Sequence, residues 1–398
     1  YGIRADSYGL NSNVTITHLG NINASTTSPY GLALGINAQT AGANSAVTVG
    51  MASSITATAA TAFGIGAYTG GANSPITITT DSTSTIDAIA SSRAVGIAAY
   101  SFGSNSPITI NNGARINTQG PVALGIFAYA NSPTSIINSG DITARGTGGT
   151  GGYGAAVGIA VTSPNANSPI SIINSGDITA TTADGYFAAG ITATSGSGNS
   201  ITIDNSGSVY AAGGALTNTA IYALGYSLSP VAVKITNTGD LSSQSHLAIF
   251  SGGNVHTDIF NAGKITGYVQ LAGLNDRFFN QSGGVFETKK TSFFGGGNDL
   301  FVNQSGGTVL AATSSSKSES SAFQGLERFE NAGLISLQDG RAGDSFKISN
   351  TPGGTDLKFV GKSGSTLAVD TFLDGPSSKS DTVTIEGNVS GTTWVHVN

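Results

Sequence analysis

Three observations in the sequence predict an all-β protein made of stacked repeats. The stretch NSPISIINSGDITAT (167–181) repeats thirteen of the fifteen residues of NSPTSIINSGDITAR (131–145), at an offset of 36. Short runs within each repeat alternate apolar and polar residues, as half-buried strands do, and none is long enough for a helix. Glycine, 57 of 398 residues, stands between these runs together with Asn, Ser and Pro, a composition typical of turns between strands.

Each repeat carries three short motifs in a fixed order, and each motif predicts one strand. The first motif is an apolar cluster around a glycine, which recurs at Gly2, Gly35, Gly64, Gly96, Gly125, Gly158 and Gly190. The second is Asn-Ser followed by a run such as VTI or ITI, which begins at Asn11, Asn44, Asn73, Asn105, Asn131, Asn167 and Asn199. The third is SGDITA or a relative, whose central apolar residue is Ile22, Ile55, Ile86, Ile116, Ile142, Ile178, Val209, Leu241, Ile265, Val285, Val309 and Ile335.

A unit of about 30 residues cannot bury its apolar side alone, so consecutive units must stack and share one core. We therefore predict a right-handed parallel β-helix with three strands in each coil and about twelve or more coils. The glycine of the NSGD corner is expected to supply a positive φ.

The spacing of the third motif divides the chain into three regions. Residues 1–240 form long coils of 29–36 residues, 241–322 form short coils of 20–24 residues, and 323–398 form a C-terminal capping module. The extra residues of the long coils are expected in loops after the third strand, as in the stretches from Arg145 and from Ala211. Large aromatic side chains gather in the last third, at Phe278, Phe279, Phe286, Phe293, Phe294, Phe301, Phe323, Phe329, Phe346, Phe359, Phe372 and Trp394.

Composition excludes several functions. The net charge of −6 leaves no basic footprint for nucleic acid. The chain has no Cys, so it has no disulfide, no thiolate metal site and no cysteine nucleophile. No stretch of 18 apolar residues occurs. Tyr1 stands inside a repeat without a leader, so we expect a processed or excised piece of a longer protein.

The last quarter resembles the C-terminal folding module of autotransporter passengers, the exported portions of type V secretion systems. The matching residues are FQGLERFENAGLISLQDG (323–340) and GSTLAVDTFLDGPSSKSDTVTIEGNVSGTTWVHVN (364–398), and the NSG coil repeats are similar to those of the same passengers. The resemblance implies a pertactin-like surface protein of a Gram-negative bacterium, whose membrane β-barrel would follow Asn398. The N-terminal coils are longer and richer in Ala and Gly than a lean pertactin-like rod, so the family leaves their activity open.

One regular surface feature is a candidate for binding. The central outward residue of the second strand carries a hydroxyl in seven consecutive coils, at Thr15, Thr48, Thr77, Thr109, Ser135, Ser171 and Thr202. Strand propensity alone accounts for this ladder, whereas a binding role would suit glycans, matrix proteins or another copy of the chain. The alternating side chains Ile16, Val49, Ile78, Ile110, Ile136, Ile172 and Ile203 should then form one buried column.

Other candidate sites are weaker. Ser345 in AGDSF occupies a repeated slot that elsewhere holds Arg277 and Leu300, so it is not expected to be a nucleophile. His18, His246, His256 and His396 are scattered over the coils. The stretch GGGNDLFV (295–302) looks like one calcium-binding nonapeptide, but Asp276 and Asp299 are 23 residues apart, and an Asn-Asp turn explains them.

An aspartate column is the best enzymatic lead. Asp141, Asp177 and Asp240 share one corner, with Ser208 interrupting and Lys264 following, and clustered Asp beside a base is what carbohydrate-active β-helices use. A local hydrogen-bonding role beside the NSG turn is the competing interpretation.

These observations predict a non-enzymatic passenger, an adhesin or display scaffold at the cell surface or secreted, without cofactor or catalytic metal. A polysaccharide lyase or hydrolase is the alternative, because the fold alone does not exclude it. The expected partners are the chain's own outer-membrane barrel and a host or matrix protein, a glycan or a second copy. Trp394 is expected to be critical for folding.

Overall fold

The computed structural model describes residues 1–148, 154–183, 187–196, 198–213, 217–226, 229–314, 316–350, 356–372, 375 and 378–398. Its described residues are all β-strands and connections, arranged as a parallel β-solenoid of about twelve coils, as predicted. Within these residues no helix is long and apolar enough to cross a membrane. The chain forms two compact units, Tyr1–Ala232 (unit 1) and Val233–Asn398 (unit 2), and the division falls within β21 (Val231–Asn237).

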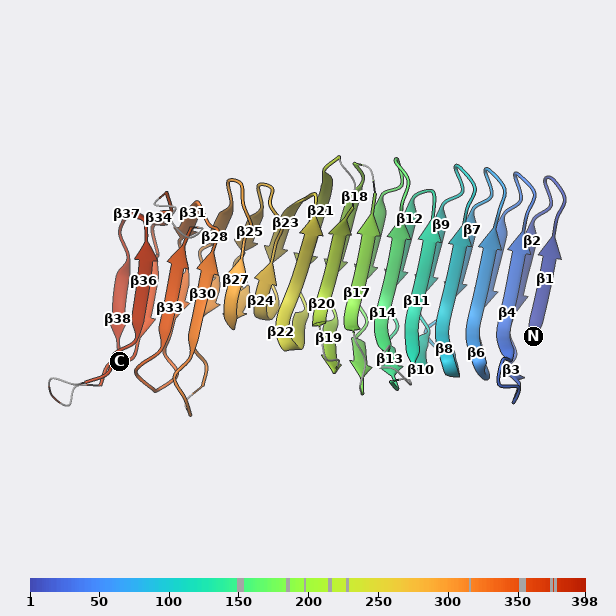
Figure 1. Ribbon diagram of the computed structural model, residues 1–398, viewed down its shortest axis with the longest axis horizontal. Helices are drawn as coiled ribbons and strands as arrows, with labels where there is room; N and C mark the ends of the chain where they lie inside the picture. Colours follow the sequence, from blue (N-terminus) through green and yellow to red (C-terminus); the bar gives the residue numbers. More distant parts are fainter. Residues whose placement is uncertain are drawn as a thin grey trace. The chain divides into compact units, whose positions relative to one another are not determined.

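Unit 1 repeats three strands per coil, and each strand pairs in parallel with its counterpart in the next coil (Figure 1). The first strands are β1 (Ile3–Ser7), β4 (Leu32–Thr40), the later part of β6 (Ser54–Thr69) and of β8 (Thr85–Ser101), β11 (Val122–Ala130), β14 (Ala155–Ser163), β17 (Phe187–Ser195) and β20 (Thr217–Gly225). The second strands are β2 (Val14–His18), β5 (Val47–Met51), β7 (Ile76–Thr80), β9 (Ile108–Asn112), β12 (Thr134–Asn138), β15 (Ile170–Asn174) and β18 (Ser200–Asn205). The third strands are β3 (Ile22–Ser25), the first parts of β6 and β8, β10 (Arg115–Gly120), β13 (Ile142–Gly146), β16 (Ile178–Thr182) and β19 (Ser208–Gly213).

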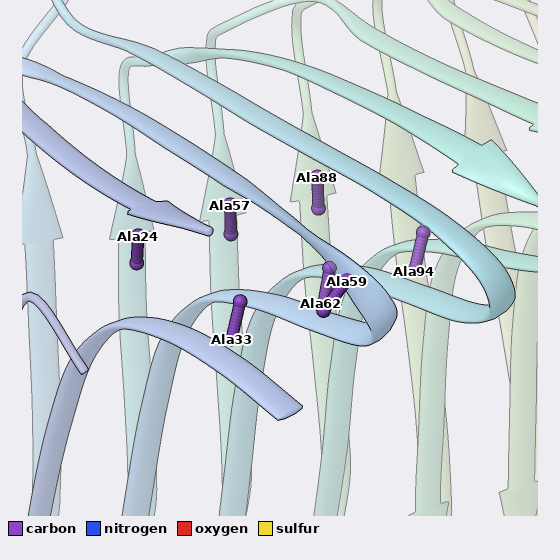
Figure 2. Packing of buried hydrophobic residues seen from close by; sticks show 7 residues of the cluster. All are labelled: Ala24, Ala33, Ala57, Ala59, Ala62, Ala88 and Ala94. Carbon is purple, nitrogen blue, oxygen red and sulfur yellow. The ribbon is translucent and has the colours of Figure 1, made fainter. Parts of the chain in front are cut away.

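After β3 the extra residues lie in a loop, 26–31, as expected, whereas in the next two coils they lie in continuous strands, which corrects the expectation there. β6 and β8 each run from the third strand of one coil into the first strand of the next. Small side chains line the inside of this bend, so the two strand layers approach closely there (Figure 2). The cluster consists of Ala24, Ala33, Ala57, Ala59, Ala62, Ala88 and Ala94. The alanine-rich composition therefore fills a narrow part of the coil. The stretches at 149–153 and 214–216 lie outside the described residues.

The repeated glycine of the first motif is required by stacking. A Cβ at Gly96 would lie 2.4 Å from Cγ2 of Ile116 and 2.6 Å from the carbonyl oxygen of Gly125 in the next coil. Gly35, Gly64 and Gly125 meet the equivalent atoms at similar distances. Since real Cβ atoms do not approach other atoms so closely, only glycine fits at these positions. In the coil after Gly190 the same register position holds Ala220.

The corner residues differ from the sequence-based expectation about positive φ. The asparagines of the Asn-Ser motif carry it, with φ of 51° to 58° at Asn11, Asn44, Asn73, Asn105 and Asn167. The glycines of NSGD do not adopt a positive φ. Glycine is needed there because a Cβ at Gly176 would lie 2.2 Å from the carbonyl oxygen of Gly140, one coil earlier.

Polar ladders run through the interior of unit 1. The asparagine that ends each of these second strands is buried, and the Nδ2 of Asn112, Asn138 and Asn174 donates to the Oδ1 of the next asparagine in the column at 2.7, 2.8 and 2.8 Å. Each Nδ2 also donates to a backbone carbonyl two residues ahead, as from Asn138 to Gly140. In these ladders the acceptor belongs to the following coil, so the ladder has a direction.

Unit 2 continues the pattern with shorter coils. Its second strands are β23 (Val255–Asn261), β25 (Arg277–Asn280), β28 (Leu300–Asn303), β31 (Arg328–Asn331), β34 (Lys358–Gly361) and β37 (Asn388–Gly391). The remaining strands are β22 (Asp240–Gly253), β24 (Lys264–Gln270), β26 (Val285–Thr288), β27 (Lys290–Phe293), β29 (Thr308–Leu310), β30 (Ser320–Gln324), β32 (Leu334–Ser336), β33 (Ser345–Ser349), β35 (Thr366–Val369), β36 (Thr382–Glu386) and β38 (Trp394–Val397).

Phenylalanine fills the interior of unit 2. Phe278, Phe301, Phe329 and Phe359 occupy one register position on β25, β28, β31 and β34, with neighbouring ring centroids 4.8, 4.8 and 5.4 Å apart. Phe286, Phe294, Phe323 and Phe346 are also buried. Phe286 pairs with Ile265 and with Val309, so it occupies the column assigned to Val285 from the sequence. That assignment was wrong by one residue, because both positions are apolar.

Candidate functional site

The hydroxyl ladder forms one outward column in unit 1. Thr15, Thr48, Thr77, Thr109, Ser135, Ser171 and Thr202 are register partners on successive second strands, and all are exposed or half-buried. The alternating residues, Ile16, Val49, Ile78, Ile110, Ile136, Ile172 and Ile203, are buried as predicted. The position of the ladder is therefore confirmed, and its role in binding stays a prediction.

A second outward column lies beside the ladder, two residues further along each strand. It holds Thr17, Gly50, Thr79, Asn111, Ile137, Ile173 and Asp204 in register. Ile137 and Ile173 are 44 % and 42 % exposed. This face of unit 1 therefore offers rows of hydroxyls next to accessible apolar groups.

The outer side of the first strands carries aromatic rings that the sequence analysis did not single out. Tyr68, Tyr100 and Tyr129 are register partners on β6, β8 and β11. Phe102 lies with its ring centroid 5.4, 6.4 and 5.5 Å from theirs, and is 43 % exposed. We call these four residues the aromatic patch. The sequence pattern that could have revealed the patch is a tyrosine four residues after the repeat glycine, which occurs after Gly64, Gly96 and Gly125.

An apolar cluster on the same side supports the patch. Val95, Ala98 and Leu124 are buried and pack with the half-buried rings of Phe63, Tyr100 and Phe127. Ile97 and Ala99 alternate with these residues and belong to the buried inner face. The rings therefore pack against side chains of successive coils.

The aspartate column has a structural role in unit 1. Asp141 Oδ1 accepts a hydrogen bond from the backbone N–H of Asp177 at 3.0 Å, and Asp177 Oδ1 accepts from Ser208 N–H at 2.9 Å. Both bonds are exposed and link one coil corner to the next. In unit 2, Asp240 pairs in register with Lys264, whose ammonium lies 2.9 Å from Glu287.

Unit 2 contains a different carboxylate ladder, at the corners before β25, β28 and β31. Thr257 N–H donates to Asp276 Oδ1, Asp276 N–H donates to Asp299 Oδ1, and Asp299 N–H donates to Glu327 Oε2, each at 2.6 Å. This explains why NDRF, NDLF and LERF repeat. Burial raises the pKa of Asp276 to about 8 and the pKa of Asp299 to about 7.

One end of this ladder lines a pocket of unit 2. The pocket has a volume of about 610 Å³ and is lined by Gly297, Asn298, Asp299, Leu300, Glu327, Arg328, Asn350, Asp356, Lys358 and Asn388. It combines Asp299, whose pKa burial raises to about 7, with two further carboxyl groups, Glu327 and Asp356, and two cationic side chains. Such a set can transfer a proton and hold a polar ligand.

The remaining candidates stand apart. Ser345 Oγ donates to Ser320 Oγ at 2.8 Å, and the two are register partners on β33 and β30. His18, His246, His256 and His396 lie on β2, β22, β23 and β38. Among the described residues no three His, Asp or Glu side chains are placed to hold a metal ion. Asp276 and Asp299 stack as ladder members, with each Oδ1 bound to a backbone N–H.

Trp394 lies on β38, which pairs with β35, and its ring is 73 % exposed. Replacing Trp394 with Ala is therefore not expected to cost the folding energy that a buried ring would contribute. Of the aromatic residues singled out from the sequence, Phe293 and Phe372 are also exposed, at 44 % and 62 %.

No protein-family profile, curated protein or solved structure matches the chain. The fold and the repeated outward columns define it as a parallel β-solenoid repeat protein.

Proposed function

We propose that this chain is the passenger of an autotransporter, exported through the outer membrane of a Gram-negative bacterium, and that it works as an adhesin. The observation that carries the proposal is repetition on the surface of unit 1. The hydroxyl ladder and the aromatic patch each present one kind of group in consecutive coils. A polymeric or flat partner can contact several such groups at once.

Repeated contacts make such a surface effective although each contact is weak. Linked binding events raise the effective concentration of the later ones, so overall avidity exceeds the affinity of any single contact. Tyr side chains add apolar contact area together with a hydroxyl at the ring edge. Glycans and extended matrix proteins offer the matching repeated chemistry, and a second copy of the chain offers the same columns.

The direction of the interior ladders supports export from the C-terminal end. In the carboxylate ladder of unit 2, a buried N–H of one coil finds its acceptor on the following coil. Coils nearer the C-terminus must therefore be in place before the earlier ones are satisfied. The resemblance of residues 323–340 and 364–398 to an autotransporter folding module agrees with this order.

A binding screen tests the adhesin function. The purified chain is applied to glycans and matrix proteins, alongside a variant with Thr48→Val, Thr77→Val and Thr109→Val and another with Tyr68→Ala, Tyr100→Ala and Tyr129→Ala. We expect both variants to lose binding, while Thr384→Val, an exposed hydroxyl of unit 2, keeps it. A wild-type chain that binds neither glycans, matrix proteins nor itself would overturn the proposal.

Surface display needs a separate measurement. Intact cells that produce the natural protein are treated with an external protease and probed for this segment. We expect cleavage without cell lysis. Protection until the cells are broken would contradict display at the surface.

The pocket that Asp299 and Glu327 line in unit 2 supports a second candidate, glycan hydrolysis or elimination. Asp299, with its pKa near 7, would act as the acid or base and Glu327 as the second carboxylate. The test is release of reducing or unsaturated ends from polysaccharides by the wild type and by Glu327→Gln. Activity lost in Glu327→Gln would favour the enzyme, whereas no activity in the wild type would remove this candidate.

A further inference from the structure

Unit 1 contains four cationic side chains, Arg4, Arg93, Arg115 and Arg145. Two of them have local partners. Arg4 Nε lies 2.6 Å from Asp6 Oδ2, and the Arg93 guanidinium lies 5.5 Å from the centroid of the Phe127 ring. The other two, Arg115 and Arg145, take part in none of the ion pairs found among the described residues.

These two arginines line the same pocket, which we call the arginine pocket. It has a volume of about 210 Å³, and its walls come from β8, β10 and β13 in three successive coils. Its lining residues are Asp87, Ile89, Arg115, Asn117, Thr118, Gln119, Thr143 and Arg145. Arg115, Gln119 and Arg145 are exposed on the third strands, so their polar groups are open to a ligand.

The only carboxylate of the pocket is already engaged by a neutral neighbour. Asn117 Nδ2 donates to Asp87 Oδ1 at 2.7 Å, and Asn117 pairs in register with both Asp87 and Thr143. Two guanidinium groups against one carboxylate leave the pocket with a net positive charge. This is unusual on a chain whose net charge is −6.

Thr118 lies behind the pocket, on the inward face of β10. It stands between Ala88 and Ala144 in the alanine column and is 2 % exposed. The polar groups that a ligand can reach are therefore those of the outward residues Arg115, Asn117 and Gln119.

We propose that the arginine pocket binds the anionic substituent of an acidic glycan, a carboxylate or a sulfate group. Guanidinium presents paired N–H donors that match two oxygens of such a group. Asn117, Gln119 and Thr143 offer donors and acceptors for sugar hydroxyls, and Ile89, 44 % exposed, offers apolar contact. The small volume suits one sugar residue of a longer chain. This inference rests on the proposed binding function and names its ligand class.

The experiment measures binding of the full chain to three oligosaccharides of equal length, one sulfated, one containing uronic acid and one neutral. The variants are Arg115→Gln, Arg145→Gln and, as the matched control, Arg4→Gln, which makes the same charge change on the same unit. We expect each pocket variant to weaken binding of an acidic glycan about tenfold or more, and the control to change it less than about twofold.

Two further readouts separate specific recognition from charge alone. Arg145→Lys keeps the charge but loses the paired donors, so it should recover only part of the affinity. Affinity for the acidic glycan should also fall as salt is raised, whereas neutral glycans should be insensitive. The sulfated and uronate arms show which anionic group is recognised.

Three outcomes would overturn the inference. These are equal binding of acidic and neutral glycans, unchanged affinity in both pocket variants, and an equal loss in Arg4→Gln. If the chain binds matrix proteins or neutral glycans but no acidic glycan, this inference is wrong and the proposed adhesin function is unaffected. Failure to bind any partner in either screen would remove both.

Discussion

The two units repeat one pattern of strands but fill it with different side chains. The interior of unit 1 is built from Ile, Val and Ala around a column of glycines, and its narrow bend is lined mainly by alanine. The interior of unit 2 is built around phenylalanine rings, and seven of the largest fully buried side chains of the described chain are phenylalanines there. Since aromatic rings bury large areas, the coils of unit 2 should be the more stable.

The polar interiors differ as well. Both units use asparagine ladders, and Asn261, Asn280 and Asn303 in unit 2 donate to the next member of their column at 2.9, 2.9 and 2.8 Å. Unit 2 adds buried carboxyl groups, which unit 1 replaces with serine hydroxyls such as Ser74 and Ser106. The same strand pattern can therefore be stacked with neutral or with titratable ladders, and only the stability of the titratable ladders should respond to pH.

The largest expected effect comes from Phe301→Ala. The Phe301 ring packs between Phe278 and Phe329, with centroids 4.8 Å away on both sides, so its removal should cost about 3–5 kcal/mol of unit 2 stability. Denaturant unfolding followed by limited proteolysis measures this for each unit. Phe372→Ala, at an exposed ring, is the control and should change stability by about 0.5 kcal/mol or less. Similar losses of unit 2 stability from both variants would contradict the idea that the buried rings stabilise these coils.

A pH titration sharpens the difference in the ladders. The folded-state pKa values of Asp276 and Asp299 lie above the ordinary value near 3.8, so the folded state holds more protons. Their favourable contribution is complete below pH 4 and is lost as pH rises through about 7 and 8. Unit 2 should therefore be less stable at pH 9 than at pH 7, with one pKa unit corresponding to about 1.4 kcal/mol.

Asp276→Asn is the matched variant for this titration, because the amide keeps the size and the Oδ1 acceptor without the titrating proton. It should reduce the loss of unit 2 stability between pH 7 and pH 9. This range also avoids His246, whose pKa is lowered by burial and which acts on the acid side. A stability that stays constant between these pH values in the wild type would contradict the raised pKa values.

A smaller effect tests the glycine column of unit 1. Gly96→Ala would place a methyl group 2.4 Å from Ile116 Cγ2, and we expect a loss of about 1–3 kcal/mol in unit 1. Gly50→Ala is the control, since its nearest atoms would lie 4.0 Å from the new Cβ, and it should change stability by about 0.5 kcal/mol or less. If Gly96→Ala leaves the stability of unit 1 unchanged, the coils can move apart at this column to accommodate the methyl group.

The smallest expected effect on equilibrium stability is that of Trp394→Ala. With the ring 73 % exposed, we expect a loss of about 0.5 kcal/mol or less. Its role in folding is a separate prediction, measured by the refolding rate and by the resistance of both units to protease during refolding. If variant and wild type refold at the same rate, Trp394 is not critical for folding.

The fold could be predicted from the sequence because each repeat consists of short motifs that recur at regular spacing. Alternation of residues such as Thr77 and Ile78 sets which side chains are buried, and the spacing of the glycines sets how coils stack. It was not enough for the register at Val285 and Phe286, where two apolar neighbours compete for one buried position. The difference of one residue reverses the face, and only packing against Ile265 and Val309 decides it.

The candidate sites were predicted less well than the fold. The hydroxyl ladder was visible because its members occupy one position of a short motif. The arginine pocket was not, because Arg115 and Arg145 occupy different positions of their strands and meet only through the stacking of three coils. The carboxylate ladder was taken for a set of turns, since the sequence does not show that Asp276 Oδ1 reaches a backbone N–H of another coil.

The one-way ladders make the two ends of any shortened version of this protein unequal. A cut that removes coils from the N-terminal side takes away donors and leaves buried oxygens, which tolerate an incomplete set of partners. A cut on the C-terminal side leaves the N–H of Thr257, Asp276 or Asp299 without its acceptor, because that acceptor belongs to the next coil, which the cut removes. Fragments for structural or binding work are therefore best trimmed from the Tyr1 end, and a new C-terminus needs a substitute acceptor.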